Sequence, residues 1–198
     1  CWDTYNDSVQ IYAKPVTAIQ APPACQGTPV QFTNMSNSSG QISYQWDLGN
    51  GFTSTDSSFS YTFGTPGFYD VTLVAVDSNN CSTTELARLE IYPNPVPNFA
   101  STEACLNSST QFTNQSYINS GSSISAYIWN FGDQSNSNQT NPNHTYAQVG
   151  TYNISLTAIS NYGCRETTVL QARVNPNPVA VFASSGSGCG PISSTFSE

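Results

Sequence analysis

The chain has 198 residues and a net charge of −8, with four basic and twelve acidic side chains, and aromatic residues make up 12% of it. Four basic residues cannot neutralise a run of phosphates, which excludes nucleic-acid binding, and no stretch of about 18 apolar residues is present that could span a membrane. Abundant aromatics with little charge are the opposite of a disordered composition, and the length fits one large or two small domains.

The first predicted element runs from Cys1 to Tyr12 and passes from a cysteine into an apolar strand. The same pattern returns at 81–92 and again at 164–175. Each copy is followed by a junction marked by a proline, at Pro15, Pro95 and Pro178. The chain opens without the basic and apolar regions of a signal peptide, so we expect a segment of a longer protein.

A short strand, a further cysteine and a second strand follow each junction. The cysteines are Cys25, Cys105 and Cys189, and the strands that follow the first two are 30–34 and 110–114. The spacing from Cys25 to Cys105 is nearly the same as the spacing from Cys81 to Cys164. Self-similarity at a fixed period is the mark of a repeat architecture. We therefore predict two complete modules, 15–93 and 94–176, flanked by the last strand of a preceding module (1–14) and the first strands of a following one (177–198).

Within each module the pattern is all-β. Segments 68–76 and 151–159 alternate apolar and polar residues with the period of two that strands have. Clusters of Gly, Asn, Ser and Pro interrupt the chain roughly every 8–12 residues, and no segment has a helical period. Short alternating strands at this spacing predict antiparallel sandwiches. In such a strand Trp46 and Trp129 are expected to point into the core.

Two sequence motifs resemble those of a known family. Tyr44 to Gly51 (YQWDLGNG) and Tyr127 to Asp133 (YIWNFGD) resemble the W-D-F-G-D-G signature of PKD (polycystic kidney disease) domains. Asn141 to Tyr146 (NPNHTY), followed by GTYNISL at 150–156, resembles the second signature of that family, with a weaker version around Phe59-Ser-Tyr61. The resemblance covers the whole chain and implies tandem immunoglobulin-like (PKD-type) antiparallel β-sandwiches in a linear array.

The resemblance also carries expectations about individual residues. Tyr69 and Tyr152 begin a late strand, where a tyrosine corner is expected in an immunoglobulin-like fold. Asp47 and Asn130 are expected to bond turn backbone. Some PKD-like domains bind calcium, but Asn replaces the signature aspartate at Asn50 and Asn130.

The sequence contains few of the residue groupings that catalysis requires. His144 is the only histidine, so a histidine-based metal site or triad is not predicted, and the carboxylates are not matched between modules. We predict that the chain is not an enzyme and needs no cofactor. A structural Ca²⁺ at a module junction stays open as an alternative, because calcium takes six to eight oxygen ligands. The candidate ligands are Asp47 and Asp133, with Asp56 and Asp77 as further carboxylates.

Six cysteines at repeat-equivalent positions predict disulfides in an oxidising compartment. In an immunoglobulin-like module, Cys25 and Cys105 lie near the A–B turn, whereas Cys81 and Cys164 lie at the opposite F–G end. Pairs within a module, Cys25–Cys81 and Cys105–Cys164, are the usual arrangement but strain the distance limit of a disulfide. A staple between neighbouring modules, Cys25–Cys164, leaves Cys81, Cys105, Cys1 and Cys189 to pair outside the segment. Both schemes remain open at this point.

We expect non-catalytic spacer modules in a long adhesin that is extracellular or on a bacterial cell surface. Cysteine-bearing tandem arrays of this kind are similar to those of large Bacteroidetes gliding adhesins, SprB-like and exported by the type IX system. The expected partners are neighbouring modules of the same chain. One alternative is self-association into a filament, and another is binding of surface glycans as an accessory module of a polysaccharide-degrading enzyme. Trp2 is the candidate aromatic for such a ligand, and Ser8 is a candidate O-glycosylation site.

Overall fold

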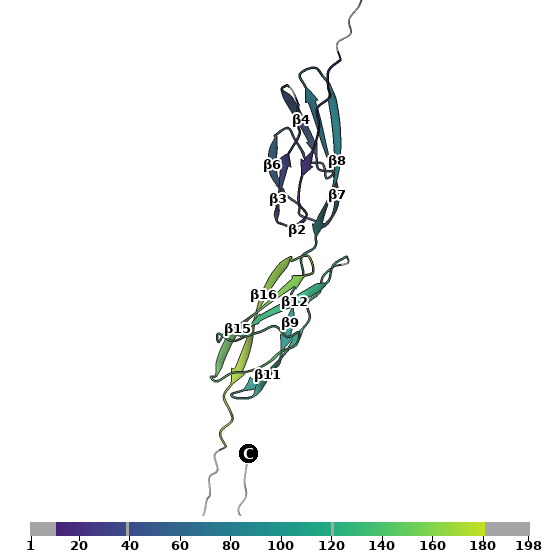
Figure 1. Cartoon of the computed structure of the whole chain (residues 1–198). Helices are drawn as coiled ribbons and strands as arrows, with labels where there is room; N and C mark the ends of the chain where they lie inside the picture. The colour runs from purple at the N-terminus through teal and green to yellow at the C-terminus, as the bar shows by residue number, and fades with distance from the viewer. Residues whose placement is uncertain (1–10, 39, 120, 181–198) are drawn as a thin grey trace, which may run out of the picture. The chain divides into compact units, whose positions relative to one another are not determined.

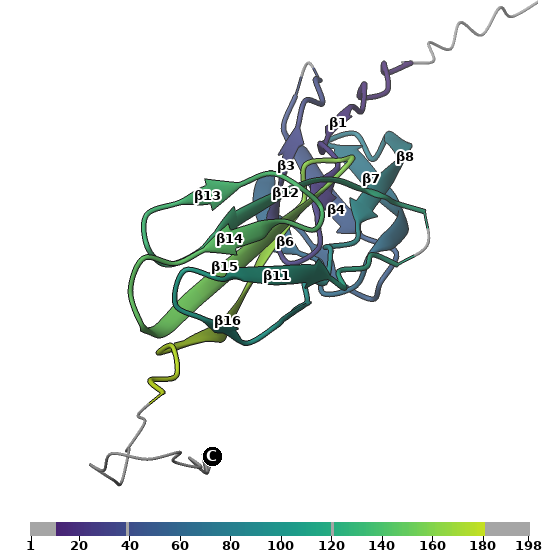
Figure 2. The ribbon, with the colours of Figure 1, turned by 90° about the horizontal axis from the view of Figure 1, so that it is seen from below.

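The computed structural model describes residues 11–38, 40–119 and 121–180. Strands and connecting loops make up all of these residues, as Figures 1 and 2 show, and none of them is helical. The predicted all-β fold is thus confirmed. In this part of the chain there is also no helix long and apolar enough to cross a membrane. Four residues of the sequence predictions, Cys1, Trp2, Ser8 and Cys189, lie outside the described residues.

The first sandwich consists of a three-stranded and a five-stranded sheet. The small sheet has the order β1-β3-β6 and the large one the order β2-β8-β7-β4-β5. The strands are β1 (Ile19–Gln20), β2 (Ala24–Cys25), β3 (Pro29–Asn34), β4 (Ile42–Asp47), β5 (Thr53–Ser54), β6 (Ser58–Thr62), β7 (Gly67–Asp77) and β8 (Ser82–Tyr92). These strands pair antiparallel except for the short parallel bridge of β2 to the end of β8.

The second sandwich repeats this topology strand for strand. Its small sheet has the order β14-β11-β9 and its large sheet the order β10-β16-β15-β12-β13. The strands are β9 (Phe99–Ser101), β10 (Ala104–Cys105), β11 (Ser109–Asn114), β12 (Ile124–Asn130), β13 (Asn136–Ser137), β14 (Asn143–Thr145), β15 (Gly150–Ser160) and β16 (Arg165–Asn175). The sequence repeat is therefore a repeat of the same sandwich.

Side-chain alternation explains which face of each long strand is buried. In β7, Val71, Leu73 and Ala75 are buried, and in β15 the corresponding positions Ile154 and Leu156 are buried. Successive side chains of a strand point to opposite faces, so these residues line the core.

Each core is built around one tryptophan, whose side chain is fully buried in both cases. Trp46 meets Phe32 and Phe59 edge to face, with ring centroids 6.0 and 5.5 Å away. Trp129 meets Phe99 and Phe112 at 5.0 and 5.6 Å. Such edge-to-face and tilted arrangements suit the quadrupoles of aromatic rings.

Each indole nitrogen has a backbone partner ten residues further along the chain. Trp46 Nε1 donates to the carbonyl oxygen of Asp56, and Trp129 Nε1 donates to that of Gln139, each at 2.9 Å. The buried polar atom of each tryptophan is therefore satisfied, as burial requires.

The turn after each tryptophan strand is also built twice in the same way. The Asp47 carboxylate accepts a hydrogen bond from the Gly49 amide, and the Asn130 side-chain oxygen accepts one from Gly132, each at 2.8 Å. Gly49 and Gly132 have φ values of 72° and 79°, which disfavour a Cβ. A Cβ at Gly132 would also lie 2.7 Å from the Asn153 carbonyl oxygen, so glycine is required on two counts.

Tyrosine corners close both sandwiches. The Tyr69 hydroxyl donates to the carbonyl oxygen of Thr65, and the Tyr152 hydroxyl to that of Gln148, each at 2.9 Å and four residues upstream. Tyr69 and Tyr152 lie at the start of β7 and β15, which is the position that an immunoglobulin-like fold gives to this motif.

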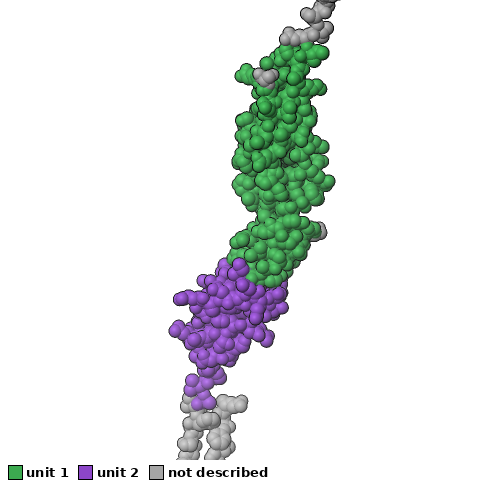
Figure 3. Space-filling model, viewed as in Figure 1, with its two compact units in different colours: residues 1–98, 116–127, 157–168 green, residues 99–115, 128–156, 169–198 purple. Residues whose placement is uncertain are grey.

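The chain divides into two compact units, shown in Figure 3. Unit 1 contains residues 1–98, 116–127 and 157–168, and unit 2 contains residues 99–115, 128–156 and 169–198. Unit 1 therefore includes, beside the first sandwich, two segments from the second half of the sequence. The segment 157–168 brings Cys164 into the same unit as Cys25.

Candidate functional site

A disulfide joins Cys25 to Cys164 within unit 1. The Cα atoms are 5.5 Å apart, which is ordinary for a disulfide, and 139 residues of sequence separate the two cysteines. Cys25 comes from the first sandwich, in β2, and Cys164 directly precedes β16 of the second. Of the two pairing schemes open from the sequence, this is the staple.

The alternative pairing within a module has no counterpart in the structure, and strand length explains why. Cys25 lies opposite Tyr92, the last residue of β8, whereas Cys81 directly precedes its first residue. An 11-residue strand spans about 36 Å at about 3.3 Å per residue. A disulfide needs Cα atoms within about 7 Å, so Cys25 cannot reach Cys81.

A strand of the same length separates Cys105 from Cys164, the second pair of the within-module scheme. Cys105 lies opposite Asn175 at the end of β16, and Cys164 precedes the start of this 11-residue strand. Cys81 and Cys105 are free thiols, half-buried and exposed respectively.

Two further interactions in unit 1 accompany the disulfide. The rings of Tyr92 and Tyr162 stack in parallel, with centroids 3.7 Å apart. The Asn94 side-chain nitrogen donates both to the Gln26 carbonyl oxygen at 3.1 Å and to the Glu166 carboxylate at 2.9 Å. These contacts were not predicted from the sequence. Tyr162 and Glu166 differ from the residues at the equivalent positions of the first module, Asn79 and Thr83, and this difference was the available signal.

The single histidine lies in a polar and aromatic cluster of unit 2. The His144 ring stacks on Phe131 with centroids 4.4 Å apart and meets Tyr146 edge to face at 4.5 Å. Its Nε2 atom lies 2.7 Å from Asp133 Oδ2 and 3.2 Å from Ser135 Oγ. The histidine that lacked a partner in the sequence pattern therefore has a carboxylate partner eleven residues before it.

These residues do not form a catalytic triad. A triad places the carboxylate on one ring nitrogen and the nucleophile on the other, so that the imidazole can relay a proton between them. Here Asp133 and Ser135 both approach Nε2 of His144, and the Ser135 hydroxyl also donates to Asp133. The arrangement closes the turn and activates no hydroxyl.

The first module has a neutral version of the same bond. Asn50 occupies the position of Asp133, and its side-chain nitrogen donates to the Tyr61 hydroxyl at 3.1 Å. Tyr61 lies opposite Val30 in the strand register, as His144 lies opposite Thr110. In the weaker version of the second signature, Phe59-Ser-Tyr61, it is therefore Tyr61 that occupies the register position of His144.

Hydrogen bonds control the ionisation of Asp133. Its partial burial opposes ionisation, but the hydrogen bonds from Ser135 and His144 outweigh that effect and hold the pKa of Asp133 below its ordinary value. A carboxylate whose pKa is lower in the folded state stabilises the protein above its unfolded pKa, near 4, and this contribution is lost as the pH falls through the folded value.

Asp133→Asn is expected to remove this dependence on pH. The variant should be less stable than the parent at neutral pH, because the amide cannot accept the same charge-assisted bonds. The difference in melting temperature should shrink as the pH falls below about 4, where the parent carboxylate becomes protonated. Thermal unfolding followed by circular dichroism from pH 7 to pH 2 measures it. A difference independent of pH would show that the Asp133 charge contributes nothing.

Each calcium candidate has hydrogen-bond partners of its own. Asp47 belongs to unit 1, where it bonds the Gly49 amide, and Asp133 belongs to unit 2, where it bonds Ser135 and His144. Asp56 accepts a bond from the Ser54 hydroxyl, and Asp77 accepts the amides of Asn79 and Cys81. Within residues 11–38, 40–119 and 121–180, no three His, Cys, Asp or Glu side chains gather as metal ligands would.

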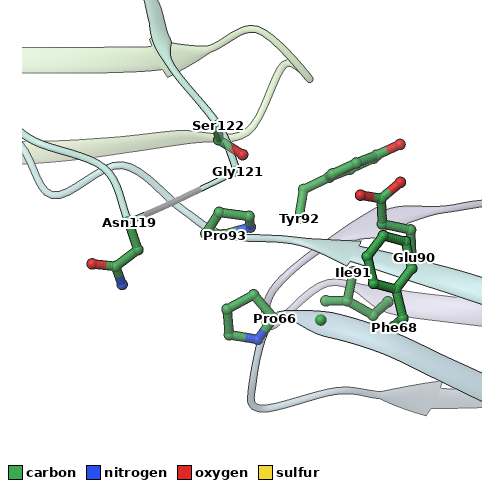
Figure 4. Close-up of a pocket in the computed structure, with 10 residues that line it drawn as sticks. Pro66, Phe68, Glu90, Ile91, Tyr92, Pro93, Asn119, Gly121 and Ser122 are labelled. Carbon is green, nitrogen blue, oxygen red and sulfur yellow. The ribbon is translucent and has the colours of Figure 1, made fainter.

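One cavity of about 260 Å³ in unit 1 has an aromatic lining (Figure 4). Phe68, Tyr92 and Pro93 line it together with Glu90, the single carboxylate among the ten lining residues. The guanidinium of Arg88 lies 4.2 Å from the Phe68 ring, and Tyr162 covers one face of Tyr92. One carboxylate offers no acid and base pair, and the tryptophans Trp46 and Trp129 are not available as a platform because both are buried.

The repeated sandwich, its tryptophan core and its tyrosine corners agree with a family model. The model described as "PKD domain" matches residues 12–91 and again residues 92–174. The chain belongs to the PKD-domain family. These ranges lie within a few residues of the modules 15–93 and 94–176 expected from the repeat.

Three relatives are a collagenase and two solved PKD domains. Collagenase ColA of Bacillus cereus is 30% identical over 73 residues, which are 37% of this chain and 8% of the collagenase. The PKD1 domain of Vibrio anguillarum Epp is 28% identical over 42% of this chain and 96% of that one, with a TM-score of 0.40. The PKD1 domain of the Vibrio cholerae metalloprotease PrtV is 28% identical over 41% and 98%, with a TM-score of 0.38.

Proposed function

We propose that the two PKD domains are non-catalytic spacer modules of a long extracellular protein. The observation that carries the proposal is the disulfide from β2 of the first sandwich to the start of β16 in the second. A bond of this kind needs an oxidising compartment, which supports an extracellular location. It also links the two modules covalently and so limits their relative motion, which suits a spacer.

The remaining features of the two modules fit a structural role. In each module the tryptophan is buried in the core, and the turn residue that follows it accepts a backbone hydrogen bond. Pro93 and Pro95 stand just after the boundary between the two family matches, and their fixed φ angles limit hinge freedom there. In a linear array of such modules, the distance between the ends is set by how stiff each junction is.

The parent protein is proposed to be a bacterial surface adhesin. The resemblance to cysteine-bearing tandem arrays supports the gliding-motility type exported by the type IX system. In this role the modules hold an adhesive segment away from the cell surface. A segment similar to this chain also occurs in an enzyme, the collagenase of Bacillus cereus. The spacer role does not depend on which of these two classes the parent protein belongs to.

Small-angle X-ray scattering tests the spacer role directly. The oxidised protein is expected to give a narrow distribution of particle dimensions, and Cys25→Ser is expected to broaden it. The reason is that a junction without the cross-link can bend. Cys105→Ser is the matched control, since it removes a thiol that takes part in no disulfide within the described residues. Identical profiles for the parent and Cys25→Ser would mean that the disulfide restricts no junction, and the spacer proposal would fail.

Glycan binding has weaker support than the spacer role. Exposed aromatic faces are what a sugar ring would stack on, and those of Phe68 and Tyr92 are partly covered by Arg88 and Tyr162. Trp2, the aromatic singled out from the sequence, lies outside the described residues.

A further inference from the structure

Two thiols remain free at positions equivalent to the bonded pair. Cys105 stands in the second module where Cys25 stands in the first, and Cys81 stands in the first where Cys164 stands in the second. A free cysteine alone indicates no partner. Here, however, the same structure contains the bonded equivalent of each, so the local surroundings of the free and bonded thiols can be compared.

The backbone around Cys105 matches that around Cys25. Cys25 lies in a parallel bridge opposite Tyr92, and the next amide, of Gln26, donates to the Tyr92 carbonyl oxygen at 2.9 Å. Cys105 lies in the same bridge opposite Asn175, and the Leu106 amide donates to the Asn175 carbonyl oxygen at 2.8 Å. Cys105 is therefore held by the same strand pairing as Cys25, and its side chain is exposed.

The backbone around Cys81 matches that around Cys164. The Cys164 carbonyl oxygen accepts the Ser160 amide at 2.8 Å, and the Cys164 amide donates to the Ser160 hydroxyl oxygen at 3.1 Å. The Cys81 carbonyl oxygen accepts the Asp77 amide at 3.0 Å, and the Cys81 amide donates to the Asp77 carboxylate at 2.9 Å.

The residue before each of these two cysteines also has the same conformation. Gly163 and Asn80 have φ values of 81° and 60°, so both hairpins turn in the left-handed region just before the cysteine. A non-glycine residue adopts this conformation at a cost, so the turn at Asn80 is a specific feature of its hairpin. The hairpin of the first module is thus shaped like the one that carries a disulfide in the second.

We propose that Cys105 and Cys81 are the two complementary halves of one recurring cross-link, each specific for a PKD module that presents the other half. Cys105 pairs with the hairpin cysteine of another module, and Cys81 pairs with the β2-type cysteine of another module. This proposal rests on the spacer function and adds the partner to it. In a solution of this chain alone, the partner is a second copy, joined head to tail. Heterologous contacts of this type build rings where the rotation between copies closes and open chains where it does not.

The reaction is a thiol–disulfide exchange with a small disulfide such as oxidised glutathione. The thiolate of one cysteine attacks the glutathione disulfide, breaks its S–S bond and releases one glutathione thiolate. The thiolate of the second protein cysteine then attacks the mixed disulfide and releases the other. The two protein thiols lose two protons and two electrons, and one glutathione disulfide becomes two glutathione thiols.

A mixing experiment tests the pairing. One variant keeps Cys105 and the other keeps Cys81, with Cys1, Cys189 and the remaining free cysteine replaced by Ser in each, and the two differ in isotope label. After equal amounts react in a glutathione redox buffer, non-reducing mass spectrometry measures the mixed and same-variant dimers. We expect mixed Cys105–Cys81 dimers in several-fold excess over the statistical share. Mapping of the intact Cys25–Cys164 peptide confirms that both variants keep the parent fold.

The outcomes separate this proposal from the spacer function. A statistical mixture of dimers would mean that the surroundings of the two thiols confer no specificity. An absence of dimers would mean that Cys105 of one copy does not come within bonding distance of Cys81 of another. Either result overturns the cross-link proposal, whereas the scattering comparison of the parent with Cys25→Ser is unaffected. Alkylation of both thiols by a small maleimide is expected, and failure of that reaction would also overturn the proposal.

Discussion

A single oxidised molecule pulled from its two ends is expected to release about 480 Å less chain than the reduced molecule. The disulfide closes a segment of 139 residues, and an extended residue spans at most about 3.5 Å. Force applied to the ends passes from Cys25 through the sulfur atoms to Cys164, so the chain between them carries no load. Only the residues before Cys25 and after Cys164 can be drawn out.

Single-molecule force spectroscopy measures this difference. In a background with Cys1 and Cys189 replaced by Ser, Cys25→Ser should show the unfolding of two modules, and the oxidised parent should show neither at full length. Cys105→Ser is the matched control and should behave like the oxidised parent, because it leaves Cys25–Cys164 intact. Full release of the chain from a protein whose disulfide is verified by peptide mapping would contradict the expectation.

The consequence for a long array follows from the sequence positions of the cysteines. Cys189 follows Cys164 as the next cysteine in the sequence and is of the Cys25 type. If the cross-link recurs as proposed, load leaving one disulfide at Cys164 passes through the segment 165–188 and enters the next disulfide at Cys189. Two whole modules would then contribute only this short segment to the extensible length. Reduction would restore the extensibility, which makes the array sensitive to the redox state.

The fold could be predicted from the sequence because the repeat supplies the evidence twice. Alternation in 68–76 and 151–159 gave the buried faces of β7 and β15, and both Trp46 and Trp129 are in the core. The tyrosine corners could be placed because an immunoglobulin-like sandwich fixes where its corner tyrosine must lie. The buried strand faces and the tyrosine corners could therefore be predicted, because they depend on short-range sequence patterns.

The pairing of the cysteines and the hydrogen bonds of His144 could not be predicted in the same way. Strand length argued against Cys25–Cys81, but an alternating pattern does not say which distant hairpin comes near Cys25. The partner of His144 was missed because Asp133 stands in a different signature, and the turn that joins the two depends on tertiary packing against Phe131. Contacts made by residues that differ between the two modules, such as the Tyr92–Tyr162 stack, cannot be found by comparing the repeats.

Replacing either core tryptophan by Ala is expected to destabilise its own module by about 3–5 kcal/mol, since it deletes the largest buried side chain and leaves a cavity. Thermal unfolding in the Cys25→Ser background should resolve the effect, because no disulfide then links the two modules. Trp46→Ala should lower the transition of the first module and Trp129→Ala that of the second. At about 4–8 °C per kcal/mol for a domain of this size, the shift exceeds about 12 °C.

The prediction depends on the two aromatic clusters being separate. The ring contacts of Trp46 are with Phe32 and Phe59, and those of Trp129 are with aromatic residues of the second sandwich. Phe68→Ala is the control for loss of an aromatic ring at an exposed site, since Phe68 is 58% exposed, and it should cost less than about 1 kcal/mol. If each tryptophan variant lowered both transitions equally, the modules would share one folding unit, and stiffness would come from common packing rather than from the cross-link.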